Sequence, residues 1–212
     1  MSLDLDPDAV LWSTNPADRD GKPLLVMMHG RGSDENDLFS LAPELPPEFV
    51  LASVRAPLAE GAGWSWWETG GPSGDPDVES VDAGAAAVST WLDSLPFTPS
   101  LVGALGFSQG GAMATHLLRR DVARIRFAVN LAGFIISGPQ PADAALATSR
   151  PPVFWGRGAD DPLFLGAMAE LVDRTAPWLA AHTTAETHAY PGLGHSISRD
   201  ELDDVVAFLR AR

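Results

Sequence analysis

The sequence has no cysteine, few basic residues and no long apolar run, and each absence excludes a class of protein. Without cysteine the chain has no disulfide, no thiolate nucleophile and no cysteine-based metal site. No apolar run approaches the roughly 18 residues of a transmembrane helix, so no stable membrane anchoring is expected. Residues 1–10 are acidic and lack the basic and apolar segments of a signal peptide. The expected location is therefore the cytoplasm.

Positive charge is also scarce, because 14 lysines and arginines face 28 aspartates and glutamates, for a net charge of −14. Nucleic acids and anionic membranes bind proteins through neutralising positive charge, so neither is expected as a partner. The five histidines are scattered, and no HExxH or clustered ligand set is present. We therefore expect no metal.

The rest of the chain is typical of a globular protein. Its 212 residues show no internal repeat, and at this length folding buries roughly 70% of the surface of the chain. Short apolar runs alternate with longer helical patterns, which predicts one α/β domain over residues 1–212. We expect strands at 24–29, 49–54, 101–107, 126–133, 152–155 and 185–190, and helices at 33–45, 78–95, 109–120, 163–181 and 199–210.

This alternation implies right-handed crossovers and a mostly parallel sheet with helices on both faces. Ser33 and Ser198 are expected to cap the first and the last helix, the latter in a capping box with Glu201. Long loops are expected at 55–77 and 134–151. In sheets of this kind, ligand sites form beyond the carboxyl ends of the strands, and the motifs below all fall there.

The first motif is G-x-S-x-G at residues 106–110, between a predicted strand and a predicted helix. This context holds the serine of such a motif in a tight turn above the sheet. Ser108 is thus a candidate nucleophile, and the backbone N–H of Gln109 can stabilise an oxyanion at the start of the helix. The alternative is a serine that only caps the helix.

A serine needs a base to take its proton and a carboxylate to orient that base. His195 is the candidate base, because it lies in a loop between the last strand and the last helix. Asp160 and Asp161 follow the strand at 152–155, in the chain order Ser, Asp, His of α/β-hydrolases. The residues alone do not choose between these two aspartates.

Residues 29–32 (HGRG) follow the first predicted strand. A glycine-rich turn there can direct a backbone N–H at the site, and Arg31 would donate through its main chain. With Gln109 this makes an oxyanion hole with two donors. The alternative is an ordinary glycine turn before a helix.

These segments together resemble the phospholipase/carboxylesterase family of small α/β-hydrolases, which includes acyl-protein thioesterases and bacterial carboxylesterases. The matching segments are HGRG at 29–32 with the acidic stretch 34–38, GFSQGG at 106–111, GADDP at 158–162 and GLGHSIS at 192–198. They occur in the family order from about residue 22 to the end.

The resemblance implies a triad of Ser108, Asp161 and His195, with main-chain Arg31 and Gln109 as the oxyanion hole. It selects Asp161 because the family acid follows the glycine of that loop by three residues. It also implies no large lid, no cofactor, and activity on small-molecule carboxylic esters or thioesters. Many members pair as homodimers, which this sequence does not decide. Two departures concern the substrate: the chain has Arg157 where the family usually has histidine, and an unusual GWSWWE loop at 63–68.

An apolar acyl pocket is the predicted substrate site, built from large side chains that follow strand ends. The alternative is that these side chains only pack loops onto the domain. The candidates are Trp64, Trp66, Trp67, Phe134, Ile135, Ile136, Leu163 and Phe164.

The leading functional hypothesis is a serine esterase or thioesterase that acts through an acyl-serine intermediate on short to medium acyl esters. One alternative is a catalytically idle hydrolase fold used for binding, since a fold does not guarantee a function. Others are a lactone or dienelactone hydrolase, or a perhydrolase, with the same triad.

Overall fold

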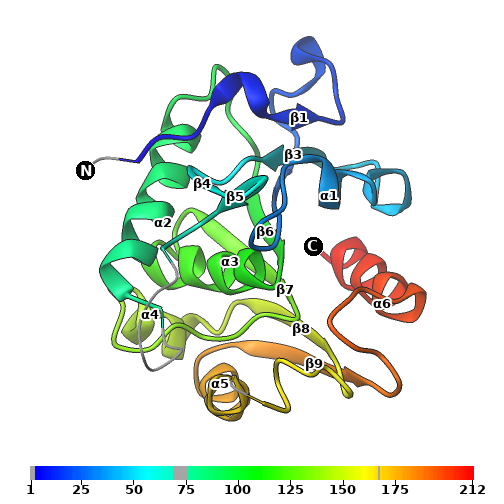
Figure 1. The fold of residues 1–212 in the computed structure, drawn as a ribbon. Helices are drawn as coiled ribbons and strands as arrows, with labels where there is room; N and C mark the ends of the chain where they lie inside the picture. The colour runs from blue at the N-terminus through cyan, green and yellow to red at the C-terminus, as the bar shows by residue number, and fades with distance from the viewer. Residues whose placement is uncertain (1–2, 69–75, 167) are drawn as a thin grey trace.

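The computed structural model describes residues 3–68, 76–166 and 168–212 (Figure 1). Within these residues the main element is a seven-stranded sheet with the strand order β1-β3-β2-β6-β7-β8-β9. Strand β1 is antiparallel to β3, and the other neighbours are parallel. The strands are β1 (Leu11–Trp12), β2 (Leu24–Met28), β3 (Val50–Val54), β6 (Val102–Phe107), β7 (Ile125–Leu131), β8 (Pro152–Gly158) and β9 (Thr184–Tyr190).

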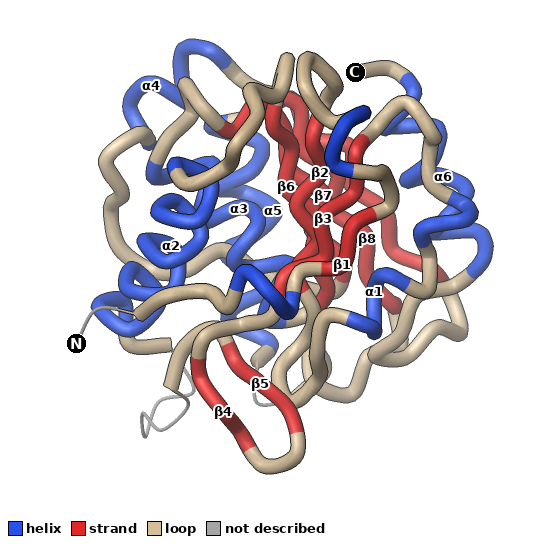
Figure 2. Tube along the Cα trace, turned by 90° about the horizontal axis from the view of Figure 1, so that it is seen from above, coloured by secondary structure: helices blue, strands red, loops and turns tan. Residues whose placement is uncertain are grey.

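Helices cover both faces of this sheet (Figure 2). On one face lie α2 (Val78–Asp93), α3 (Gln109–Arg120), α4 (Asp143–Ser149) and α5 (Ala169–His182). On the other lie α1 (Asn36–Phe39) and α6 (Arg199–Arg210). Single-turn 3-10 helices occur at Pro7–Ala9, Pro16–Asp18 and Ala42–Glu44.

Two hydrophobic cores form, one on each side of the sheet. Val26 and Ala104 pack with the helices of the larger layer, whereas Leu25 and Leu105 belong to the same core as Phe208 of α6. Every residue of β2 and β3 is buried, which is why these strands appear in the sequence as unbroken apolar runs. The predicted α/β fold with a mostly parallel sheet is confirmed. Among the described helices, none combines the length and apolar character required to cross a bilayer.

The predicted first helix, 33–45, is wrong. The α-helical part is only Asn36–Phe39, followed by the 3-10 turn Ala42–Glu44. Ser33 is not an N-cap, because its backbone forms a bridge with Trp64 and is drawn into a sheet-like pairing. Tertiary pairing has therefore overridden a local capping signal.

Both predicted long loops contain regular structure. The first holds an antiparallel hairpin of β4 (Leu58–Glu60) and β5 (Gly63–Ser65), while residues 69–75 lie outside the described part. The second holds helix α4. The predicted helix 163–181 begins only at Ala169, because the carbonyl of Asp161 accepts the N–H groups of Phe164 and Leu165 in a separate turn. Residue 167 of that range also lies outside the described part.

Candidate active site

Ser108 lies at the turn between β6 and α3, with φ at +55° in the left-handed region. Its N–H donates to the carbonyl of Leu131 on the neighbouring strand at 2.7 Å, which holds the turn against β7. The turn has no space for side chains on either side. A Cβ on Gly106 would lie 2.1 Å from the carbonyl oxygen of Gly110, and one on Gly110 would lie 2.0 Å from that of Met28. The glycines of the motif are therefore a steric requirement of this close approach.

The structure brings Ser108, His195 and Asp161 into one hydrogen-bonded chain. Ser108 Oγ lies 2.9 Å from His195 Nε2, and His195 Nδ1 lies 2.6 Å from Asp161 Oδ2. Asp161 is fully buried, and its other oxygen, Oδ1, accepts the N–H of Leu163 at 2.9 Å. A buried acceptor at Nδ1 places the imidazole proton there and leaves Nε2 free to accept from Ser108.

Asp160 has a different partner. Its Oδ2 accepts the N–H of Gly192 at 2.8 Å, and its own N–H donates to the carbonyl of Leu193 at 3.0 Å. The two neighbouring aspartates thus divide their contacts, since Asp161 binds the imidazole and Asp160 binds the backbone of the loop that carries it. The paired aspartates were visible in the sequence, but the contact of Asp160 was not predicted.

The His195 ring is enclosed by two phenylalanines. Its centroid lies 4.9 Å from that of Phe107 and 6.1 Å from that of Phe164, the latter edge-on. Phe164 was a pocket candidate in the sequence, and it lies in the turn that follows Asp161. These rings restrict the rotation of the imidazole and keep it partly away from water.

The two candidate oxyanion donors belong to segments that adjoin Ser108. Gly30 is adjacent to it, since a Cβ there would lie 3.6 Å from Ser108 Cβ, and Arg31 follows. Gln109 is the first residue of α3, where N–H groups have no intrahelical acceptor. The Arg31 side chain pairs with Glu60 of the hairpin, so its guanidinium is engaged away from the nucleophile.

His29 is buried at the end of β2, and both nitrogens of its ring bind backbone groups. Its Nδ1 donates to the carbonyl of Gly30 at 2.7 Å, and its Nε2 accepts the N–H of Ala56 at 3.1 Å. This pairing requires the neutral ring, and burial lowers the pKa of His29 accordingly. His29 is therefore a fixed link between the candidate oxyanion segment and the next strand.

His116 also has partners far from Ser108. It is buried within α3, with Nε2 2.7 Å from a carboxylate oxygen of Asp82, and burial lowers its pKa to about 4. His182 contacts the carbonyl of Trp178 in its own helix. Of the five histidines, His195 is the one within hydrogen-bonding distance of Ser108 among the described contacts.

The pocket candidates differ in exposure. Trp66, Trp67, Phe134, Ile135 and Ile136 are all buried, and Trp67 meets Phe134 edge-on with 6.5 Å between centroids. Trp64 is half-buried, and the Leu163 side chain is 43% exposed directly after Asp161. The structure thus gathers the buried candidates in the larger core cluster, and their contact with a substrate stays a prediction.

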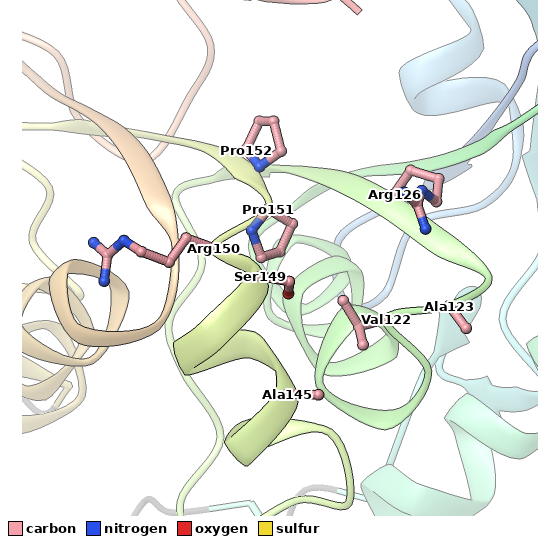
Figure 3. Close-up of a pocket in the computed structure, with 8 residues that line it drawn as sticks. All are labelled: Val122, Ala123, Arg126, Ala145, Ser149, Arg150, Pro151 and Pro152. Carbon is pink, nitrogen blue, oxygen red and sulfur yellow. The ribbon is translucent and has the colours of Figure 1, made fainter.

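A cavity of about 340 Å³ lies at the opposite end of the sheet (Figure 3). It is lined by residues that precede or begin β7 and β8, including Arg126 and Arg150. Figure 3 shows these two side chains on opposite sides, and Arg150 donates to the carbonyls of Ala180, Ala181 and Thr183. The cavity therefore has no converging charges and is separate from the serine site. Within the described residues, no group of three or more metal-binding side chains gathers.

Comparisons with known proteins identify the family of this chain. A family model described as Phospholipase/Carboxylesterase matches residues 13–212. A probable carboxylesterase SOBER1-like of Arabidopsis thaliana is 34% identical over 188 residues, which cover 81% of this chain and 66% of that protein. Acyl-protein thioesterase 1 of Debaryomyces hansenii is 25% identical over 217 residues, which cover 89% of this chain and 90% of that protein.

The matched segment spans about half to two thirds of the Arabidopsis relatives, namely 66% of the protein above and 50% of carboxylesterase SOBER1. Among solved structures, a carboxylesterase from Mesorhizobium loti aligns over 100% of both chains, with a TM-score of 0.77 and 22% identity. At that identity the likeness concerns the fold.

Proposed function

Because the chain belongs to the phospholipase/carboxylesterase family, we propose that it is a serine hydrolase of carboxylic esters or thioesters. The observation that carries the proposal is the hydrogen-bonded chain from Ser108 through His195 to Asp161, at 2.9 and 2.6 Å. The family resemblance stated from the sequence is confirmed by the match over residues 13–212. The catalytic roles below belong to the proposal.

In the acylation step, His195 Nε2 takes the proton of Ser108 Oγ as Oγ attacks the acyl carbon of the substrate. The negative charge moves to the former carbonyl oxygen, where the backbone N–H groups of Gln109 and Arg31 stabilise it. The protonated imidazole then gives its proton to the departing alcohol or thiol. The products of this step are an acyl-serine and the free leaving group.

In the deacylation step, a water molecule replaces the alcohol. His195 takes a proton from the water, the resulting hydroxide attacks the acyl-serine, and the proton returns to Ser108 Oγ as the acid departs. Asp161 stays ionised throughout, because it holds the tautomer of His195 and stabilises the imidazolium formed in each step. No step requires a cofactor.

The proposed substrates are uncharged short to medium acyl esters. The named activities of the relatives, carboxylesterase and acyl-protein thioesterase, support an acyl substrate with an oxygen or sulfur leaving group. The net charge of −14 gives anionic substrates no long-range attraction. Trp64 and Leu163 are the proposed exposed parts of the acyl pocket, and the buried pair of Trp67 and Phe134 forms its floor.

The test is the release of p-nitrophenol from acetate, butyrate and octanoate esters by the wild type and by Ser108→Ala. Loss of at least a thousandfold in kcat with unchanged thermal stability is expected, because the variant has no nucleophile. Undiminished turnover in the variant would contradict the proposal. Inactivity of both folded proteins on esters, thioesters and lactones would favour the binding protein instead.

A further inference from the structure

We propose that Gln109 is also a positioning residue, whose side-chain amide keeps the two oxyanion donors, the backbone N–H groups of Arg31 and Gln109, at a fixed spacing. This inference rests on the proposed function, in which Gln109 donates through its backbone. The side chain acts through the segment Trp64–Trp67, which contacts both donor elements.

The side chain of Gln109 is directed away from the nucleophile and into the protein. A glutamine in the first turn of a helix is normally exposed, yet this one is only 5% exposed. Its Oε1 accepts the N–H of Trp66 at 2.8 Å, and its Nε2 donates to the carbonyl of Trp67 at 3.3 Å. Both polar ends of the amide therefore bind the backbone of a segment that lies more than 40 residues earlier in the chain.

The same segment is attached on its other side to the strand that precedes Arg31. The indole N–H of Trp66 donates to the carbonyl of His29 at 2.9 Å, and the Trp66 side chain is fully buried. The rings of Trp66 and His29 also pack together, with 5.5 Å between centroids. Trp66 thus donates one hydrogen bond to the first residue of α3 and one to the end of β2.

Strand β5 also binds the backbone that directly follows the donor Arg31. The N–H of Gly32 donates to the carbonyl of Trp64 at 2.8 Å, and the N–H of Trp64 donates to the carbonyl of Ser33 at 2.8 Å. The two backbones are so close that a Cβ on Gly63 would lie 2.1 Å from the carbonyl oxygen of Gly32. Arg31 therefore lies between two attachment points, at His29 and at Gly32, on one rigid partner.

The donor elements also contact each other directly, because Gly30 lies beside Phe107 and Ser108. Gly110 packs against the carbonyls of Met28 and His29, before the chain turns into Gly30 and Arg31. Arg31 lies beyond these direct contacts, and the Trp64–Trp67 segment, which is bonded to both elements, holds its N–H relative to that of Gln109. An oxyanion hole acts by preorganisation, so a small change in donor spacing lowers transition-state stabilisation more than substrate binding.

The experiment compares Gln109→Met with Ser80→Ala, in which the hydroxyl that accepts the N–H of Glu68 at 3.0 Å is removed. Methionine matches the length of glutamine but cannot bind the Trp66 and Trp67 backbone. The control loses the bond to Glu68, the residue that directly follows this segment and is distant from the donors. Measurements are kcat and KM for p-nitrophenyl butyrate, thermal stability, and inhibition by a boronic acid, whose serine adduct has the tetrahedral geometry of the intermediate.

For Gln109→Met we expect a fall in kcat of about tenfold to a hundredfold, with KM within about twofold, and a matching loss of boronate affinity. Ser80→Ala is expected to keep both values within about twofold. If Gln109→Met does not fold, Trp66→Phe, which loses the bond to the carbonyl of His29, should show the same fall in kcat at constant KM.

An unchanged kcat in Gln109→Met, or a change confined to KM, overturns the inference. An equal fall in kcat for Ser80→Ala also overturns it, because the effect would then be general to the segment. If Gln109→Met does not fold, an unchanged kcat in Trp66→Phe overturns it as well. The proposed function is judged separately by Ser108→Ala, whose loss of turnover would stand in each case.

Discussion

The carboxylate of Asp160 accepts the backbone N–H of Gly192 at 2.8 Å, three residues before His195. Its neighbour Asp161 meanwhile binds the imidazole of His195 directly. One aspartate thus fixes the loop and the next one fixes the ring. Their separate contacts lead to different expected effects of substitution.

Asp160→Ala should lower kcat by about threefold to tenfold, because the loop that carries His195 loses one anchor while the triad itself is intact. The stability loss should be about 1 kcal/mol, typical of one hydrogen bond. Ester hydrolysis and thermal unfolding would measure both. Asp121→Ala is the matched control, since its exposed carboxylate accepts the N–H of Arg124 at 3.0 Å far from the triad. Equal loss of activity in both variants would contradict a specific effect on the loop.

Asp161→Asn should lower kcat by about 10⁴-fold at neutral pH. The side-chain oxygen of the new asparagine would keep the N–H of Leu163, so its NH₂ would face His195 Nδ1. That donor forces the imidazole proton onto Nε2, which then cannot accept from Ser108. Steady-state kinetics of Asp161→Asn and Asp160→Asn would test this. A larger loss in Asp160→Asn would reverse the assignment of the acid.

Glu201 should make the protein less stable as the pH rises. Both its carboxyl oxygens are buried without a hydrogen-bond partner, and one lies against Gly156. Burial raises the pKa of Glu201 from 4.5 to about 7 against the lowering effect of the Ser198 backbone N–H, and the negative charge of Asp204 adds a smaller upward contribution. The folded state therefore holds this proton more tightly than the unfolded state does. The contribution is fully present below pH 4.5 and is lost as the pH rises through 7.

Glu201→Gln should remove that dependence, because the amide has no proton to lose in this range. Relative to the wild type, the free energy of unfolding should rise by up to about 3 kcal/mol between pH 5 and pH 8. Urea unfolding of both proteins at several pH values provides the measurement. Parallel stability curves for the two proteins would show that Glu201 ionises normally.

Leu163→Ala should reduce the preference for longer acyl chains. Leu163 is 43% exposed beside the triad acid, and its loss would remove apolar contact from a chain longer than acetate. We expect kcat/KM for the octanoate ester to fall by about threefold to tenfold, with acetate within about twofold. The control is Leu165→Ala, which is 70% exposed in the same turn. Equal losses on acetate and octanoate would place Leu163 outside the acyl pocket.

Local patterns were sufficient for some elements and insufficient for others. The helices α3 and α6 begin and end at the predicted residues, because α3 starts directly after the tight turn at Ser108 and α6 starts at the Ser198 cap. The Ser198 hydroxyl accepts the N–H of Glu201 at 3.1 Å, as the capping box predicted. The Ser198 backbone N–H, the reciprocal half of that box, acts on the Glu201 carboxyl and lowers its pKa, while the Glu201 side chain lies against Gly156 of β8.

The elements that sequence reasoning missed depend on contacts between distant segments. The β4–β5 hairpin pairs with Ser33, and that pairing shortens the predicted first helix at the same time. The buried amide of Gln109 had one signal in the sequence, its place within the GFSQGG segment. That signal pointed to its backbone N–H, and nothing local indicated that its side chain would bind the tryptophan loop.

The sequence by itself determined the α/β architecture, the edge of the sheet at which the site lies, and the candidacy of Ser108 and His195. These follow from hydrophobic periodicity and from a turn motif, which depend on neighbours in the chain. The residues alone left Asp160 and Asp161 open, and the family resemblance selected Asp161. The tertiary structure decided by contact that Asp161 meets the imidazole, and it alone decided that Gln109 is bound to Trp66. Side chains select such partners from residues brought together by folding, and that information is not contained in any one local stretch of the chain.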